Sequence, residues 1–133
     1  IMIRLVNLTP HIIKVFDDRN QMVEEIYSSK LPVRVVESCI ARYGMAVKTD
    51  RKMVHGFLVK ELVESKISNM PDKKQNTMYI VSRVAAQYIA RYMQRDDILT
   101  IADYVRDPKS GVILGCRNFC KVIDKDKLKK ILK

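Results

Sequence analysis

The chain has 133 residues, 47% of them hydrophobic, which suits one domain over residues 1–133 with an ordinary core and excludes a disordered chain. It contains no apolar run long enough to span a membrane and opens without an export signal, so we expect a protein of the host cell cytoplasm. Twenty-five Lys and Arg against fifteen Asp and Glu leave a net charge of +10. Such an excess favours nucleic acid, an acidic membrane surface or a phosphorylated small molecule as partner, although it also serves solubility alone.

The first half of the chain is typical of β-strands. Residues rich in Val and Ile predict strands over 3–8, 11–16, 22–27, 33–42 and 57–66. Thr9-Pro10 predicts a kink between the first two, because proline lacks an N–H and keeps its predecessor extended. Residues 17–20 are expected to turn and residues 69–76 to form a polar loop. Residues 43–56 show no decisive pattern.

The second half predicts a strand, a helix and a hairpin. A strand over residues 78–81 precedes Ser82, a candidate N-cap for a helix whose apolar residues share one face. After a short strand over 98–101, a turn over residues 107–111 joins 104–106 to 112–116 in a hairpin, since Pro108 and Gly111 suit a turn. The basic tail, 124–133, has the apolar spacing of a short helix. The predicted fold class is α+β, a mainly antiparallel β-sheet with one central amphipathic helix and a C-terminal hairpin.

Nothing in the sequence predicts catalysis, a metal or a cofactor. Cys39, Cys116 and Cys120 form an odd set without the spacing of a zinc site, as is usual in a reducing compartment. His11 and His55 have no recognisable acid partner, and no phosphate-binding glycine loop is present. We therefore predict a binding protein and rank a nucleotide hydrolase third among the functions considered.

Arginines beside turns are the candidate ligand contacts. If Arg106 and Arg117 face each other across the hairpin, an anion between them would relieve their repulsion, since guanidinium groups match phosphate oxygens. The alternative is a set of solvated ion pairs with neighbouring Asp residues. The helix N-terminus predicts that residues 79–83 frame one side of a phosphate pocket. Tyr79 would then stack on a base, unless it is a core residue.

Five short motifs carry a resemblance. They are Asn7-Leu8-Thr9-Pro10-His11, then Tyr79-Ile80-Val81-Ser82-Arg83 before a helix, Arg95-Asp96-Asp97, Arg106-Asp107, and Gly111 followed by Gly115-Cys116-Arg117. Together they resemble the anti-Thoeris sponge family of phages and prophages. The resemblance covers the first strand and roughly the last 60 residues, and the middle of the chain is unmatched.

The resemblance implies a non-enzymatic homo-oligomer, a dimer or larger, that sequesters a cyclic ADP-ribose isomer made by a bacterial TIR-domain enzyme and so silences a host defence. Tyr79 would be the stacking aromatic, and Arg106 with Asp107 would contact phosphate and ribose. Asn7, His11 and Arg117 are added as ligand contacts because they cluster in the same motifs. A phage takeover protein that binds nucleic acid or a host protein is the alternative, although no RNP, KH or helix-turn-helix signature is present.

Overall fold

A computed structural model describes residues 2–29 and 31–132, and within them the chain forms two compact units. The first unit joins the N-terminal part of the chain, up to Arg34, to the part from Ile67 onward, and the second is Val35–Lys66. The predicted α+β class is confirmed. None of the helices in the described residues is long and apolar enough to cross a membrane.

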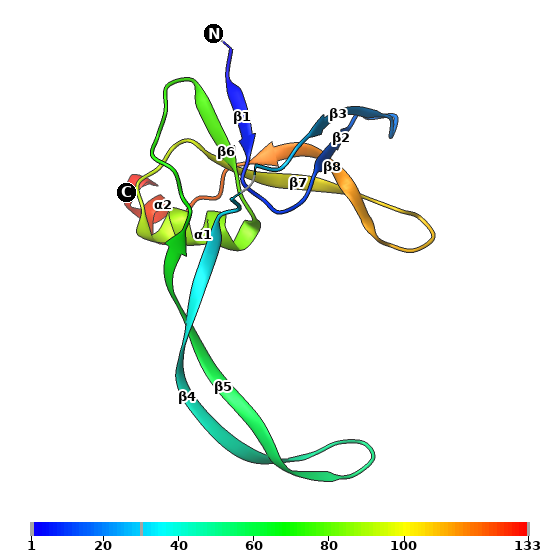
Figure 1. The fold of residues 1–133 in the computed structure, drawn as a ribbon, viewed down its shortest axis with the longest axis vertical. Coiled ribbons are helices and arrows are strands. Elements are labelled where there is room, and N and C mark those ends of the chain that lie inside the picture. Colours follow the sequence, from blue (N-terminus) through cyan, green and yellow to red (C-terminus); the bar gives the residue numbers. More distant parts are fainter. Residues whose placement is uncertain (1, 30, 133) are drawn as a thin grey trace. The chain divides into compact units, whose positions relative to one another are not determined.

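The first unit is built on a six-stranded sheet (Figure 1). Its strands lie in the order β1-β6-β7-β8-β2-β3. Their bounds are Arg4–Asn7 for β1, Thr77–Ile80 for β6, Ile98–Arg106 for β7, Ile113–Cys120 for β8, Ile13–Phe16 for β2 and Met22–Ile26 for β3.

The sheet contains both parallel and antiparallel pairs of neighbouring strands. The two local hairpins, β7-β8 and β2-β3, are antiparallel, as adjacent strands joined by short turns must be. Strands that are distant in the sequence pair in parallel, namely β1 with β6 and β2 with β8. Strand β6 also runs parallel to β7, and the helix α1 (Arg83–Tyr92) makes the crossover between them. The parallel pairs were not predicted, because side-chain alternation along a strand does not specify the direction of its neighbour.

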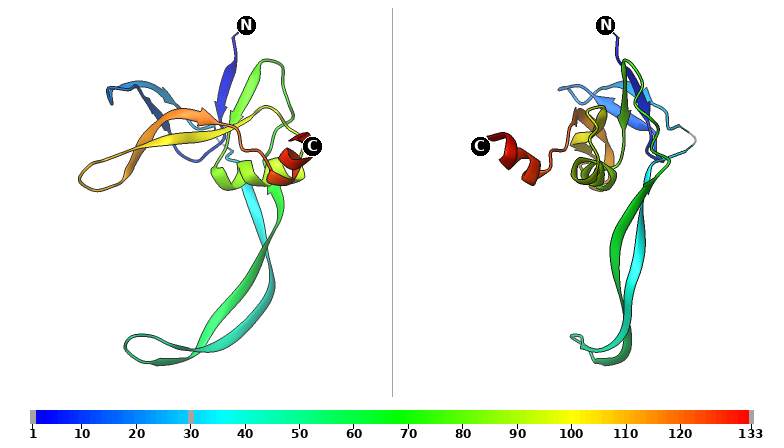
Figure 2. Two further views of the ribbon diagram at one scale, coloured as in Figure 1. Left: turned by 180° about the vertical axis from the view of Figure 1, so that it is seen from behind. Right: turned by 90° about the vertical axis from the view of Figure 1, so that its left-hand side faces the viewer.

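Helix α1 covers part of the sheet and closes the core. It packs against β7 (Figure 2). Ala85, Ala86 and Ile89 of the helix are buried. Ile80 and Cys116, on β6 and β8, have no exposed side-chain surface. Burial raises the pKa of the Cys116 thiol, so this cysteine is a neutral core residue.

The second unit is a two-stranded ribbon of β4 (Arg34–Lys48) and β5 (Met53–Ser68), shown in cyan and green in Figure 1. The strands predicted over residues 33–42 and 57–66 are therefore longer than expected. Residues 43–56, which sequence patterns left unassigned, supply the ends of both strands and the turn that joins them. No residue between Val35 and Lys66 is buried.

The elements predicted for the chain from Ser82 onward are also present, and some of them are longer than expected. Ser82 is confirmed as the N-cap of α1, since its side chain accepts a hydrogen bond from the Ala85 N–H at 3.3 Å. The strands expected over 98–101 and 104–106 are one strand, β7, with Asp103 at a positive φ of 53° between them. The basic tail forms the helix α2, Lys125–Leu132.

Candidate ligand-binding site

Sheet topology brings two loops together at one end of the first unit. In the parallel pair of β1 and β6, Asn7 lies opposite Ile80, so both strands end at the same edge. The loop with Thr9, Pro10 and His11 leaves from β1, and the first turn of α1 leaves from β6. The carboxyl ends of parallel strands are the usual place for ligands in such sheets.

Asn7 holds the first of these loops in shape. Its side chain is 1% exposed, and its amide group donates to the carbonyls of His11 at 2.7 Å and Ile26 at 2.9 Å. Its Oδ1 accepts from the Thr9 N–H at 2.9 Å and from the Thr9 hydroxyl at 2.7 Å. An asparagine amide has two donor hydrogens and accepts about two bonds, so Asn7 has no capacity left for a ligand.

The second loop brings a cation to the helix N-terminus. Arg83, the first residue of α1, donates one hydrogen bond to the Ile101 carbonyl at 2.9 Å. The remaining N–H groups of its guanidinium have no protein acceptor among the described residues. The first turn of α1 carries no acidic residue, so its free N–H groups and the helix dipole favour an anion there.

A cavity of about 620 Å³ lies between these two loops and strands β7 and β8. One side is formed by the Thr9–His11 segment and by Val81, Ser82 and Arg83. Apolar side chains of the sheet form much of the remainder, and they include Ile13, Ile101, Ile113 and Leu114. This volume is within the range of small-molecule sites, which are commonly apolar with a few placed polar groups.

The charged groups at the cavity are all potential cations. Lys14 and Arg83 line it together with His11, and no Asp or Glu is among its lining residues. Within the described residues, no group of three His, Cys, Asp or Glu is placed to hold a metal ion. The Ser82 hydroxyl serves as a helix cap and has no His or carboxylate partner in the described residues. The arrangement suits the binding of an anion with an apolar portion.

Of the six residues predicted to bind ligand, His11 alone lines this cavity, and Asn7 supports the loop that carries it. Tyr79 lies in the core with 3% of its surface exposed, on strand β6 between β1 and β7. Its hydroxyl donates to the Asp72 carbonyl at 3.2 Å. The structure therefore gives Tyr79 the core role that the sequence left open, and its ring has no free face for a base.

The hairpin does not bring Arg106 and Arg117 together. Arg106 on β7 pairs with Ile113 on β8. Arg117 lies on β8 between Cys116 and Asn118, which pair with Tyr104 and Ala102 on β7. The two positions are thus about three residues, or ~10 Å, apart along the ladder. Arg106 donates to the Gly111 carbonyl at 2.9 Å, and Arg117 donates to the side chain of Asn20.

Asp107 has a structural role in the turn. Its carboxylate accepts from the N–H groups of Lys109 at 2.8 Å and Ser110 at 3.2 Å. The Gly111 N–H donates to the Asp107 carbonyl at 2.8 Å, which closes the turn. The aspartate side chain is therefore occupied by the turn that it stabilises.

Two cavity residues were missed by sequence reasoning. Lys14 lies on β2, where an exposed lysine in an otherwise apolar strand was the available signal. Tyr104 lines the cavity on β7, is 40% exposed and directly follows the unusual backbone at Asp103. An exposed aromatic ring at a cavity is suited to stacking on a base.

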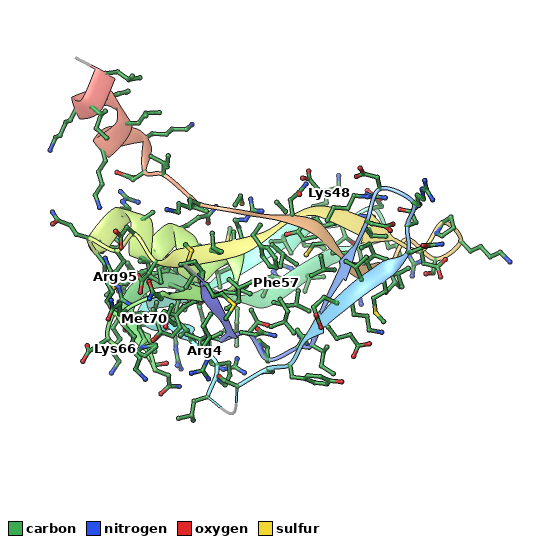
Figure 3. The ribbon with its side chains drawn as sticks, turned by 90° about the horizontal axis from the view of Figure 1, so that it is seen from above. Arg4, Lys48, Phe57, Lys66, Met70 and Arg95 are labelled. Atoms are coloured by element: carbon green, nitrogen blue, oxygen red, sulfur yellow. The ribbon has the colours of Figure 1, made fainter. Side chains whose placement is uncertain are left out.

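The Arg95-Asp96-Asp97 motif stabilises the fold away from this cavity. Asp97 is 4% exposed and receives two hydrogen bonds from Arg95, at 2.8 and 2.9 Å. Arg95 also donates to the Pro71 carbonyl at 2.9 Å, and Figure 3 labels it beside Met70. Hydrogen bonding to Asp97 raises the pKa of Arg95, and the side-chain hydrogen bond from Lys73 lowers the pKa of the exposed Asp96.

In comparisons with known proteins, no family model, curated protein or solved structure matches this chain.

Proposed function

We propose that the protein binds an anionic nucleotide in the cavity between the Thr9–His11 loop and α1 and releases it unchanged. The observation that carries this proposal is a cavity lined by Lys14 and Arg83, at a helix N-terminus, with no carboxylate in its wall. Anions bind at helix N-termini through free N–H groups, and arginine adds paired donors for phosphate oxygens.

The apolar part of the wall supports a nucleotide over a simple phosphate. Ile13, Ile101 and Leu114 offer surface to a base or sugar, and Tyr104 offers an exposed ring. The resemblance to the anti-Thoeris sponges suggests a cyclic ADP-ribose isomer as the ligand. On this proposal the protein is a sponge, which lowers the free concentration of a TIR-derived signal and performs no reaction.

The proposal is tested by calorimetry with cyclic ADP-ribose isomers on the purified protein. Arg83→Gln is expected to weaken binding at least about tenfold, because a charged hydrogen bond contributes roughly 1.5–3 kcal/mol. Arg106→Gln is the matched control, since this exposed arginine lies outside the cavity and is expected to leave affinity unchanged. Equal losses in both variants would contradict the assignment of the site.

A second measurement separates binding from catalysis. After incubation with excess ligand, heating should release the nucleotide with its mass unchanged. Accumulation of ADP-ribose or AMP over several turnovers would make the protein an enzyme. Absence of any nucleotide binding would instead favour the alternative, a phage protein that binds nucleic acid or a host protein through its basic surface, since the chain carries a net charge of +10.

A further inference from the structure

The β4-β5 ribbon lacks the contacts that normally stabilise strands of its length. Its strands have 15 and 16 residues, yet they pair only with each other in the described residues. An isolated two-stranded hairpin is marginal in water, and three or more strands or a covering layer are needed for stability. The ribbon by itself is therefore marginally stable, and a further strand or a covering layer would stabilise it.

Large apolar side chains lie exposed along both strands. Ile40, Leu58 and Leu62 are 66%, 81% and 53% exposed. On β5, Leu58 and Leu62 lie on one face, while Phe57 and Val63, which are 52% and 45% exposed, lie on the other. Both faces of the ribbon thus carry apolar surface that a partner would cover.

The edges of the ribbon are open as well. Each strand has one hydrogen-bonded neighbour, so its outer edge presents unpaired N–H and C=O groups. Proline, which blunts exposed edges in many proteins, is absent from residues 35–66. A long open strand edge without proline is a template for a further strand.

Charge favours a protein over a nucleic acid as the occupant. Residues 35–66 contain six Lys or Arg and four Asp or Glu, a net charge of +2 out of the +10 of the whole chain. Phosphate backbones are bound by concentrated positive charge, and six cations offset by four anions over 32 residues do not provide it. The ribbon is therefore suited to a nearly neutral, apolar partner strand.

Strand β5 is complementary to itself when two copies run antiparallel. Lys60, Leu62 and Glu64 alternate along one face of β5, and neither charged group forms an ion pair in the part of the chain that the structure describes. If Leu62 of one copy lies opposite Leu62 of a second, each Lys60 lies opposite Glu64 of the other. No like charges are then directly opposed on this face, and two ion pairs flank an apolar centre.

We propose that β5 pairs antiparallel with β5 of a second copy, about a two-fold axis at Leu62, to form a four-stranded sheet. An antiparallel pair of identical strands is two-fold symmetric, so the interface closes as a dimer. The pairing supplies the third and fourth strands that the ribbon needs and satisfies one open edge of each copy. This interface is independent of the nucleotide cavity.

A cysteine placed on the axis tests this register in the full-length protein. In a Cys39→Ser background, Leu62→Cys is expected to form a covalent dimer under mild oxidation, because directly opposite Cβ atoms are about 4.5–5.5 Å apart. Leu58→Cys is the matched control, on the same face but eight residues from its symmetry mate, or ~26 Å along the strand. Cross-linking of the two variants to the same extent would overturn the proposal.

An exchange of the charges at positions 60 and 64 tests the same pairing without covalent cross-linking. Lys60→Glu and Glu64→Lys each place like charges opposite one another twice per dimer, and each is expected to raise the dimer dissociation constant about tenfold in sedimentation. The double variant restores opposite charges and is expected to restore the dimer. Arg42→Glu on β4 is the control and should leave the dimer intact. Three results would each refute β5 pairing: a wild-type protein that is monomeric at all concentrations, a double variant that does not recover the dimer, or an Arg42→Glu variant that dissociates. Circular dichroism confirms that every variant is folded.

Discussion

Gly115 lies on β8 where this strand runs close to β2. A Cβ atom at this position would be 2.2 Å from the Lys14 carbonyl oxygen and 2.7 Å from the Phe16 ring. The first of these neighbours is backbone, which cannot move aside as the end of a flexible side chain can. The glycine therefore allows the parallel pairing of Val15 with Cys116 that places Lys14 at the cavity.

At this residue scale, Gly115→Ala is expected to lower the free energy of unfolding by about 1–3 kcal/mol through overpacking. Gly44→Ala is the control, because no atom lies within 4 Å of a Cβ built on that strand glycine. Urea denaturation of both variants measures the difference. Equal stability of the two would show that β2 can shift away from β8 at little cost.

At both ends of α1, side chains form hydrogen bonds with backbone groups that lack partners within the helix. One of these side chains is adjacent in the sequence and the other is distant. Ser82 caps the N-terminus from the preceding residue. At the other end, Lys127 of α2 donates to the carbonyls of Ala90 at 2.7 Å and Met93 at 3.0 Å. A positive charge at the last carbonyls of a helix is favourable because these groups lack intrahelical partners.

At the scale of elements, Lys127→Met is expected to cost about 1 kcal/mol of stability, since it keeps the aliphatic stem and removes the charge from the end of α1. Lys129→Met in the same helix is the control, because the Lys129 side chain is exposed and donates no hydrogen bond among the residues that the structure describes. Thermal and urea unfolding followed by circular dichroism provide the comparison. If Lys129→Met loses as much stability as Lys127→Met, the lost stability comes from α2 itself and not from the contact with α1.

The charge of the whole molecule separates the two candidate functions. A nucleic-acid complex with six or more phosphate contacts is expected to weaken about a thousandfold between 50 and 200 mM salt, because each contact releases counterions. A nucleotide with two phosphates, bound at Lys14 and Arg83, releases far fewer and should weaken less than about tenfold. Titration at the two salt concentrations measures the slope. Tight and steeply salt-dependent binding of RNA or DNA, without nucleotide binding, would contradict the sponge function.

Features that depend on neighbours in the chain were predictable. The N-cap at Ser82 and the apolar face of α1 follow from residues within a few positions of each other. The turn over residues 107–111 follows likewise from its own Asp, Pro and Gly. The ribbon was half predictable: its apolar strands were recognised, but the weak pattern over residues 43–56 concealed their length, since a strand without a core side need not alternate.

Features that depend on pairing between distant segments of the chain were not predictable from the sequence. Alternating apolar residues mark a strand equally well in parallel and antiparallel pairs, so the adjacency of β1 and β6, which creates the cavity, leaves no local trace. For the same reason Arg106 and Arg117 were plausible neighbours until the register separated them. Composition and local sequence patterns together predicted a basic α+β chain with a capped helix. Only the tertiary structure showed that Tyr79 is buried, that the hydrogen-bonding groups of Asn7 are all used within the protein, and that Lys14 and Arg83 line one cavity. Each of these properties depends on which distant residues the fold places around a side chain, and not on the residue type itself.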